Sequence, residues 1–221
     1  MLPIIFAAAA VFVASPQADG AASTANAQET AYFAAGCFWC SEADFEKVDG
    51  VSEAISGFTG GDTVNPSYKD VTGGGTGHYE AVKVLYDPQT VSYDELLYHY
   101  WRNVDPLDAG GQFCDRGESY RSAIFVTDDA ERSAAQASKN ESEQALGKEV
   151  VTPVLTFEEF YPAEDYHQDY YKSDDRILSR FGYVTKQYAY DGYREGCGRD
   201  ARLMEIWGDE ALGFNAKDAS S

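Results

Sequence analysis

One cysteine in this chain is placed to act as a nucleophile, because a glycine precedes it and two aromatic residues follow it. It is the second residue of Gly36-Cys37-Phe38-Trp39-Cys40. Residues 32–35 resemble a short buried strand and residues 41–48 follow helical spacing, so we expect Cys37 at a strand-to-helix turn. Free backbone N–H groups and the helix dipole there favour an anion, which predicts an acidic thiol. A cysteine that packs as a small hydrophobe is the alternative interpretation.

Three further cysteines are scattered along the chain, at Cys40, Cys114 and Cys197. In an exported protein the four could form two structural disulfides. Only one C-x-x-C is present and no histidine follows it at ligand spacing, so we expect no metal site.

The elements that must position these residues follow from apolar spacing and from helix-capping residues. The expected strands cover 81–86, 122–126 and 150–157, the last at a sheet edge because Pro153 interrupts it. The expected helices cover 94–103 with Ser92 as N-cap, 128–147 with Thr127 as cap and Gly147 as C-terminal stop, and 163–172.

Two glycine-rich stretches, 57–77 and 105–117, separate these elements, and loops of that length in a compact domain are usually functional. The pattern predicts an α+β fold: a two-layer sandwich with a ferredoxin-like mixed sheet, helices on one face, long glycine-rich loops and a C-terminal tail.

Polar motifs lie beside the expected strand ends, where scaffolded sites collect. Asn65-Pro66-Ser67-Tyr68 follows a glycine run, Gly75-Thr76-Gly77-His78-Tyr79-Glu80 enters the strand at 81–86, and the segment 115–122 enters the next one. Together the motifs resemble those of the A-type peptide methionine sulfoxide reductases. The motifs that appear in the family's order, from about Thr30 to Tyr193, are G-C-F-W-C, G-G-x-x-x-N-P-S-Y, T-G-H-x-E, Y-D-P, D-x-G-x-x-Y-R-S and A-E-D-Y-H-Q.

The resemblance implies a thiol-dependent oxidoreductase that reduces the S epimer of methionine sulfoxide in proteins and peptides. It implies no bound cofactor, and thioredoxin or another dithiol as external reductant. It also implies a role for each matching position: Cys37 as nucleophile, Phe38 and Trp39 as walls of an apolar pocket for the S-methyl group, Glu80 as the acid near the sulfoxide oxygen, Tyr68 and Tyr120 as its hydrogen-bond partners, and Asp115 as a supporting carboxylate.

The chemistry of these residue types agrees with those roles. A sulfoxide sulfur is a poor electrophile until its oxygen receives a proton or strong hydrogen bonds. A carboxylic acid such as Glu80 donates at neutral pH only where its surroundings raise its pKa. Tyrosine hydroxyls donate without charge, and aromatic rings favour a methylated sulfur. The ordinary alternatives are a solvated charge for Glu80, packing for Trp39 and the two tyrosines, and a turn cap for Asp115.

Attack leaves a cysteine sulfenic acid, which condenses with a second thiol to a disulfide that an external dithiol reduces. The resemblance favours Cys197 as this resolving cysteine, because the family commonly keeps such residues in flexible C-terminal segments. Cys114 is the second candidate and Cys40 the third.

One competing hypothesis is a thioredoxin-like dithiol oxidoreductase that uses Cys37 and Cys40. Another is a non-catalytic exported binding module whose disulfides are structural.

The charge of the chain limits its possible partners, and its N-terminal segment indicates where it is located. Acidic residues number 37 against 17 basic ones, for a net charge of −20, so neither nucleic acid nor anionic membrane is expected as a partner. We interpret 1–27 as a signal peptide ending at Ala25-Asn26-Ala27, although no Lys or Arg precedes Lys47; a disordered leader is the alternative. We therefore expect a periplasmic or secreted monomer without a membrane span, with a catalytic domain at 28–193 and a tail at 194–221 that holds the resolving cysteine and a short helix.

Overall fold

The structure is a computed structural model that describes residues 28–213. The expected signal peptide lies outside the described residues, as do positions 214–221 of the tail. The strands are β1 Glu29–Ala35, β2 Val51–Thr59, β3 Tyr79–Tyr86, β4 Gly111–Gln112, β5 Asp115–Arg116, β6 Ser122–Val126, β7 Val154–Thr156, β8 Phe160–Pro162, β9 Arg176–Ser179 and β10 Gly182–Thr185. The α-helices are α1 Phe38–Phe45, α2 Tyr68–Gly73, α3 Tyr93–Arg102, α4 Asp129–Leu146, α5 Lys186–Gly196 and α6 Arg199–Trp207, with short 3₁₀ turns η1 Glu118–Tyr120, η2 Asp165–His167, η3 Tyr170–Lys172 and η4 Gly208–Glu210.

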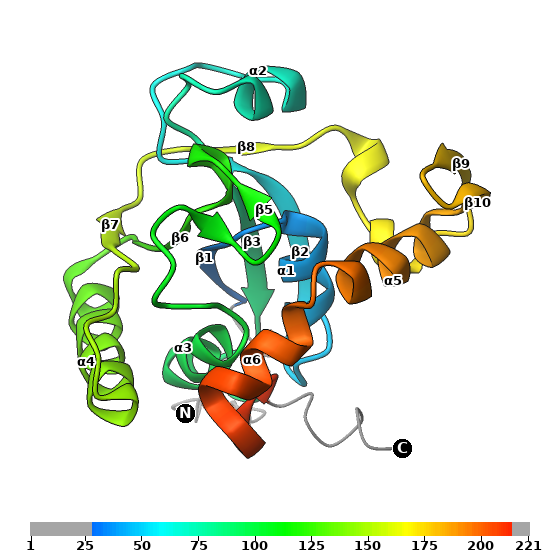
Figure 1. Cartoon of the computed structure of the whole chain (residues 1–221). Coiled ribbons are helices and arrows are strands. Elements are labelled where there is room, and N and C mark those ends of the chain that lie inside the picture. Colours follow the sequence, from blue (N-terminus) through cyan, green and yellow to red (C-terminus); the bar gives the residue numbers. More distant parts are fainter. Residues whose placement is uncertain (1–27, 214–221) are drawn as a thin grey trace, which may run out of the picture.

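Six strands form one sheet in the order β7-β6-β1-β3-β2-β8 (Figure 1). All neighbours pair antiparallel except β6 and β7, which are parallel and joined through α4. In chain order β1, α1, β2, β3, α3 and β6 make a split βαβ arrangement whose strands lie in the order β6-β1-β3-β2. The prediction of an α+β fold with a ferredoxin-like mixed sheet is therefore confirmed.

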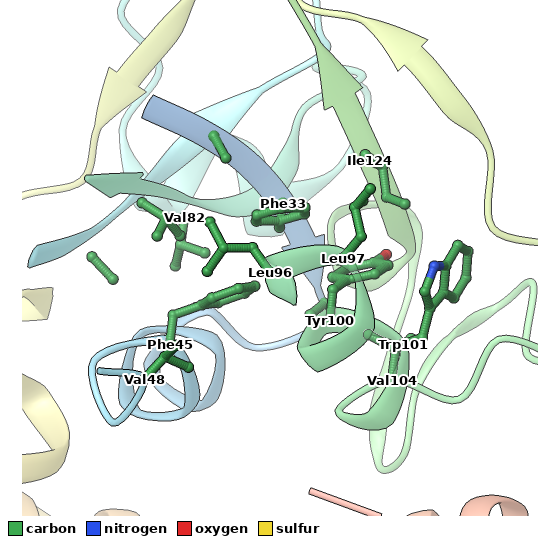
Figure 2. Packing of buried hydrophobic residues seen from close by; sticks show 14 of the residues in the cluster. Phe33, Phe45, Val48, Val82, Leu96, Leu97, Tyr100, Trp101, Val104 and Ile124 are labelled. Atoms are coloured by element: carbon green, nitrogen blue, oxygen red, sulfur yellow. The ribbon is translucent and has the colours of Figure 1, made fainter. Parts of the chain in front are cut away.

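The main core lies between the sheet and the helices α1 and α3 (Figure 2), and α4 adds Ala135 to it. Phe33 of β1 is fully buried and stacks on Phe45 of α1 and on Tyr100 of α3, with ring centroids 4.8 and 5.2 Å apart. Side chains of both helices and of three strands complete this cluster, among them Val82, Leu96, Leu97 and Ile124. This core fixes β1 and α1 against each other, and with them the turn that joins the two.

Several expected elements are present with small differences. Ser92 caps α3, as predicted, and it also forms a capping box with Glu95. The helix predicted at 128–147 is α4, and Gly147 ends it in the left-handed region at φ +61°. Its cap is Asp128, not Thr127, because the Asp128 carboxylate accepts the Glu131 N–H at 2.8 Å. The strand predicted at 150–157 shortens to β7, which does lie at the sheet edge.

Two expectations about the middle of the chain were wrong. The loop predicted from residue 57 starts later, because β2 continues through Gly57 to Thr59. A Cβ at Gly57 would come within 2.5 Å of the Tyr161 carbonyl, so only glycine lets β8 pair this closely. The helix predicted at 163–172 is two 3₁₀ turns, η2 and η3. Between them the Gln168 amide bonds both backbone groups of Ser56 in β2, at 2.9 Å each, and this tertiary pairing replaces a helix.

The tail is helical over most of its described length, not a glycine-flanked coil. Helix α6 confirms the predicted short helix, and its Leu203 is fully buried in the main core. Arg194 of α5 and Arg199 of α6 both pair with Asp44 of α1, at 2.8 and 3.6 Å. Arg199 is 2% exposed and also donates to the carbonyls of Ala35 and Asn103. The tail is therefore bound to the helix that begins at Cys37.

Among the residues from 28 to 213, no helix has the length and apolar character needed to cross a membrane.

Removing the Asp44 carboxylate is predicted to destabilise the fold strongly, because it leaves the buried Arg199 guanidinium with carbonyl partners only. Breaking a buried ion pair costs roughly 3–5 kcal/mol, and urea unfolding of Asp44→Ala is expected to show a loss of about that size. The matched control is Asp108→Ala, which removes a carboxylate from the surface pair with Arg116 and should stay close to the parent protein. Equal losses in the two variants would contradict a stabilising role for the tail contacts.

Candidate active site

A cavity of about 260 Å³ brings all of the predicted site residues together. They come from seven separate elements or turns, and each lies beside the end of a strand or helix. Its lining includes Cys37, Phe38, Trp39, Tyr68, Glu80, Asp115, Tyr120 and Cys197. The predicted site residues, which are spread from position 37 to position 197, thus line one cavity, as the sequence motifs predicted.

The cavity is built on the turn between β1 and α1. Gly36 has φ +85°, and a Cβ there would lie 2.5 Å from the Gln112 side chain, so the turn requires glycine. Cys37 is the N-cap residue of α1, and its carbonyl accepts the N–H groups of Cys40 and Ser41 at 3.1 and 3.2 Å. The predicted strand-to-helix turn at Cys37 is confirmed.

The prediction that Cys37 has an acidic thiol was wrong for this resting structure. Its pKa is raised well above the ordinary value, first by the hydrogen bond that it shares with the Cys40 thiol and then by burial. The nearby charges of Glu80 and Asp115 act in the same direction. The position at a helix N-terminus does not offset these effects. Cys37 therefore keeps its proton at neutral pH until the reaction begins.

Glu80, the second residue of β3, is 1% exposed. Burial raises its pKa to about 8, which confirms the prediction of a carboxyl group that stays protonated at neutral pH. Its Oε2 accepts the backbone N–H of Phe38 at 3.0 Å, next to Cys37 in the chain. Its Oε1 is buried, and the Tyr120 hydroxyl lies close enough to the carboxyl to act against the rise in its pKa. One oxygen orients the group, and the carboxyl lines the cavity beside Tyr120.

Two tyrosine hydroxyls and a second carboxylate complete the polar part of the cavity. The Tyr68 and Tyr120 hydroxyls lie within hydrogen-bonding reach of each other. Burial raises the pKa of Tyr68 to about 12, and burial together with the charge of Glu80 raises the pKa of Tyr120 further. Both tyrosines are therefore neutral hydrogen-bond donors at any physiological pH. Burial also raises the pKa of Asp115, whereas the positive charges of Arg199 and Arg180 act against that shift.

Aromatic rings form the apolar wall. Phe38 is buried, whereas Trp39 is half-buried and stacks on Tyr170 with ring centroids 3.8 Å apart. The Trp39 indole N–H donates to Nδ1 of His167 at 3.1 Å, which fixes the plane of the ring. Burial lowers the pKa of His167 to about 4, so its imidazole is neutral and accepts this bond. His167 therefore supports the wall, as expected for a structural histidine.

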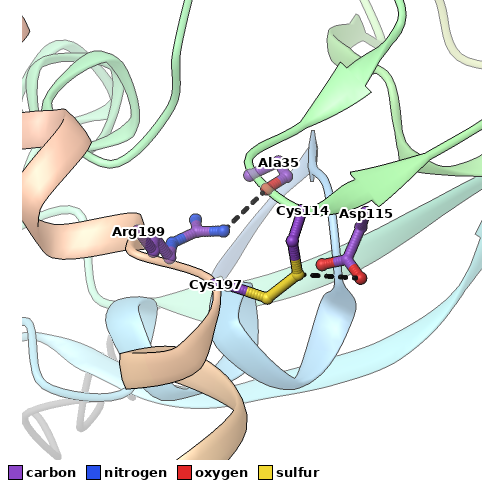
Figure 3. The surroundings of a disulfide bond; sticks show 5 residues. All are labelled: Ala35, Cys114, Asp115, Cys197 and Arg199. Carbon is purple, nitrogen blue, oxygen red and sulfur yellow. Dashed lines mark hydrogen bonds between the residues drawn. A yellow bond between two sulfur atoms is a disulfide. The ribbon is translucent and has the colours of Figure 1, made fainter.

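The four cysteines divide into two pairs. Cys114 and Cys197 form a disulfide across 83 residues (Figure 3). Cys37 and Cys40 are free thiols. In this structure Cys197, the favoured resolving cysteine, is therefore bonded to Cys114, the second candidate for that role.

Comparison with known proteins agrees with this site. The sequence profile of the peptide methionine sulfoxide reductase family matches residues 29–194. The chain belongs to the peptide methionine sulfoxide reductase family. It is thus an oxidoreductase that reduces methionine sulfoxide through thiol and disulfide chemistry, which decides against the thioredoxin-like and non-catalytic alternatives.

Individual relatives lead to the same family. The chain is 49% identical over 209 residues to a protein of Caulobacter vibrioides named peptide methionine sulfoxide reductase MsrA 2, covering 94% of this chain and 98% of the relative. A protein of the same name from Rhizobium meliloti is 46% identical, covering 85% and 88%. The solved structure of methionine sulfoxide reductase A of Corynebacterium diphtheriae matches with a TM-score of 0.59 at 34% identity, covering 65% of this chain and 73% of that one.

Several residues that line the cavity of this sulfoxide reductase were not predicted from the sequence. They are Phe113, Arg180, Tyr190, Tyr193, Arg194 and Arg199. Most of them follow residue 172, where the predicted helix at 163–172 ends. They lie on the hairpin β9–β10 or on α5 and α6, and these elements carry no strong motif. Phe113 adjoins Cys114, and its φ of +55° is unusual for an aromatic residue. The sequence around Phe113 does not predict that conformation.

Loss of the Glu80 proton donor is predicted to slow methionine formation in a single turnover by roughly 10²–10⁴-fold. Glu80 is protonated below pH about 8 and loses its proton above it. The ratio of the parent rate to the Glu80→Gln rate should therefore be constant at lower pH and fall above pH about 8, since titration of the thiols affects both proteins. Glu141→Gln, on the exposed face of α4, is the matched control and should keep the parent rate. A ratio that does not change with pH would exclude Glu80 as the acid.

Proposed function

We propose that this enzyme repairs the S epimer of oxidised methionine in proteins and peptides, with Cys37 as nucleophile and Glu80 as proton donor. One observation carries the assignment. The buried Glu80 carboxyl is oriented by the amide of Phe38, keeps its proton at neutral pH because burial raises its pKa to about 8, and lines the same cavity as Cys37. An acid and a thiol are thus placed to act on one bound group.

The reaction follows from the resting protonation of the two groups. The Cys37 sulfur attacks the sulfoxide sulfur while Glu80 donates its proton to the sulfoxide oxygen. The hydroxyl then moves from the substrate sulfur to the Cys37 sulfur as the S–O bond of the substrate breaks, and the bond between the two sulfurs breaks to release methionine and leave a sulfenic acid at Cys37. The proton lost by the Cys37 thiol restores the Glu80 acid. Neither group needs to be charged in the apolar cavity before the substrate arrives.

The other cavity residues select and hold the substrate. Phe38 and Trp39 provide an apolar surface for the S-methyl group, and aromatic rings make favourable contacts with sulfur. The hydroxyls of Tyr68 and Tyr120 donate hydrogen bonds to the sulfoxide oxygen as its negative charge develops. Asp115 supports this polar side of the cavity. All of these residues belong to one chain, and we propose that the enzyme acts as a monomer.

An external dithiol of the thioredoxin type is the proposed source of electrons. Cys114 is exposed at the mouth of the cavity, whereas Cys40 is only 8% exposed. A protein reductant cannot enter a cavity of about 260 Å³, so it must meet a sulfur at the surface. The Cys114–Cys197 disulfide provides that sulfur.

Replacing the nucleophile is predicted to abolish the reaction. Cys37→Ser should form no methionine from a peptide that contains the S sulfoxide, with dithiothreitol or thioredoxin as reductant, measured by chromatography of the peptide. The parent enzyme should convert the S epimer and leave the R epimer unchanged, which controls for chemical reduction by the dithiol. Turnover by Cys37→Ser at the parent rate would refute the assignment.

Export is the proposed location of this repair, on the basis of the apolar leader and the Ala25-Asn26-Ala27 cleavage pattern. Expression of the full chain in a Gram-negative host is predicted to yield mature protein in the periplasmic fraction, with an N-terminus at about Gln28 by mass spectrometry. Substitution of Ala27 by a bulky residue, such as Ala27→Tyr, should block the cleavage. Full-length protein in the cytoplasmic fraction would contradict export.

A further inference from the structure

Three arginines line the cavity, and they differ in what they bind. Arg194 forms ion pairs with Asp44 at 2.8 Å and with Asp200 at 2.7 Å. Arg199 is 2% exposed and donates to two backbone carbonyls. Arg180 is exposed, and among residues 28–213 its contacts are with aromatic rings alone, without a hydrogen bond or an ion pair. Its positive charge is therefore available to a ligand.

The tip of the β9–β10 hairpin holds Arg180 at the mouth of the cavity. The Phe181 ring packs on the backbone of α5 at Gly192, where a Cβ would come within 2.6 Å of the ring. Glycine at this position lets the hairpin approach the helix so closely. The guanidinium carbon of Arg180 then lies 4.5 Å from the ring centroid of Tyr193 and 4.9 Å from that of Phe181. Because Tyr193 also lines the cavity, Arg180 is held at its edge.

The contact with the two rings leaves the hydrogen-bonding capacity of Arg180 unused. A cation–π contact holds the guanidinium in place through its charge. Its five N–H donors remain for an acceptor, and their planar arrangement matches the two oxygens of a carboxylate. A guanidinium that is held in this way loses less conformational freedom when it binds a carboxylate than a mobile one would. Arg180 is thus preorganised for a carboxylate ligand.

The charge of Arg180 is opposite to that of the protein as a whole. The net charge of the chain is −20, so its field repels a carboxylate that approaches. Asp115 adds a carboxyl group to the lining of the cavity. Burial raises the pKa of Asp115, and the positive charges of Arg199 and Arg180 act against that rise. The influence of Arg180 therefore extends into the cavity, where it offsets part of the repulsion.

The size of the cavity decides which part of a substrate meets Arg180. About 260 Å³ accommodates the oxidised side chain of one methionine, but not the peptide on either side of it. The neighbouring residues of the substrate must therefore lie across the mouth, where the exposed Cys114 and Arg180 are found. A group close to the oxidised methionine in sequence is thus the one that Arg180 can reach.

We propose that Arg180 binds a carboxylate next to the oxidised methionine, and that the enzyme therefore prefers substrates with an acidic group at this place. The proposal rests on the proposed function and specifies its substrates. The carboxylate is either the side chain of a neighbouring Asp or Glu or the C-terminus of a chain that ends at the methionine, since both present the same two oxygens. Arg180 acts on substrate binding and does not touch the reacting atoms.

Four peptides with the S sulfoxide test this contact. One is neutral with both ends blocked, two carry Asp directly before or after the oxidised methionine, and the fourth is neutral but ends at the methionine with a free carboxylate. Methionine formation is measured at low ionic strength with dithiothreitol, a small reductant that needs no protein contact. Arg180→Gln is expected to lower kcat/KM for the carboxylate peptides, relative to the neutral one, by about two- to fivefold, the effect of an exposed ion pair. Whichever of these peptides are affected identify the source of the carboxylate.

Three further readouts separate a contact with substrate from a structural role. The loss should lie in KM with kcat unchanged, it should shrink in high salt, and Arg180→Lys should restore part of it by keeping the charge. The matched control is Arg176→Gln, which removes the same charge from the same hairpin. Arg176 donates to the Tyr183 carbonyl at 3.3 Å and does not line the cavity, so this variant should treat all four peptides as the parent does.

Equal losses on all four peptides in Arg180→Gln, or the same selective loss in Arg176→Gln, would overturn the proposal. The first result would show that Arg180 only supports the hairpin, and the second that the total charge of the protein sets the preference. If the parent enzyme forms no methionine from the neutral peptide, the proposed function fails. If it converts that peptide and Arg180→Gln does not change the preference among the four, only the carboxylate contact fails.

Discussion

The burial of the Glu80 carboxyl beside Cys37 is the constraint on which the site depends. An ionised carboxylate is unstable in an apolar environment, so the group keeps its proton to a pH of about 8. The N–H of Phe38 holds one oxygen at 3.0 Å and so fixes the direction of the other. The same peptide unit that follows the nucleophile therefore orients the acid, and the two groups cannot move independently.

This burial has a second effect, on the nucleophile. A cavity that keeps Glu80 neutral also disfavours a thiolate at Cys37, and its pKa rises. The two results are compatible because sulfoxide reduction needs a proton at the oxygen at the moment when the thiol loses one. A resting pair of neutral groups places no charge in the apolar cavity, and the charge separation arises only when the substrate is present. A Cys37 thiolate beside Glu80 would instead place a negative charge in the apolar cavity and raise the pKa of the acid still further.

Features of the site that depend on neighbouring residues could be predicted from the sequence, whereas features that depend on residues distant in sequence could not. The turn at Gly36 and Cys37 and the N-cap at Ser92 follow from neighbouring residues, and both were predicted. The family motifs also placed every proposed catalytic residue in one cavity. The pKa of Cys37 was not predictable, because it depends on Cys40, Glu80 and Asp115 from three elements. The two 3₁₀ turns at 165–172 were missed for the same reason, since Gln168 bonds a strand 112 residues away.

The tail is held rigidly against the helix that follows the proposed nucleophile. The Asp44 carboxylate of α1 pairs with Arg194 and Arg199, one on each side of Cys197. Cys197 is therefore fixed next to the turn at Cys37, and it is bonded to Cys114. Cys114 is the exposed member of this disulfide, whereas Cys37 shares the cavity with the buried Glu80. The ion pairs that stabilise the fold thus also hold an exposed disulfide beside Cys37.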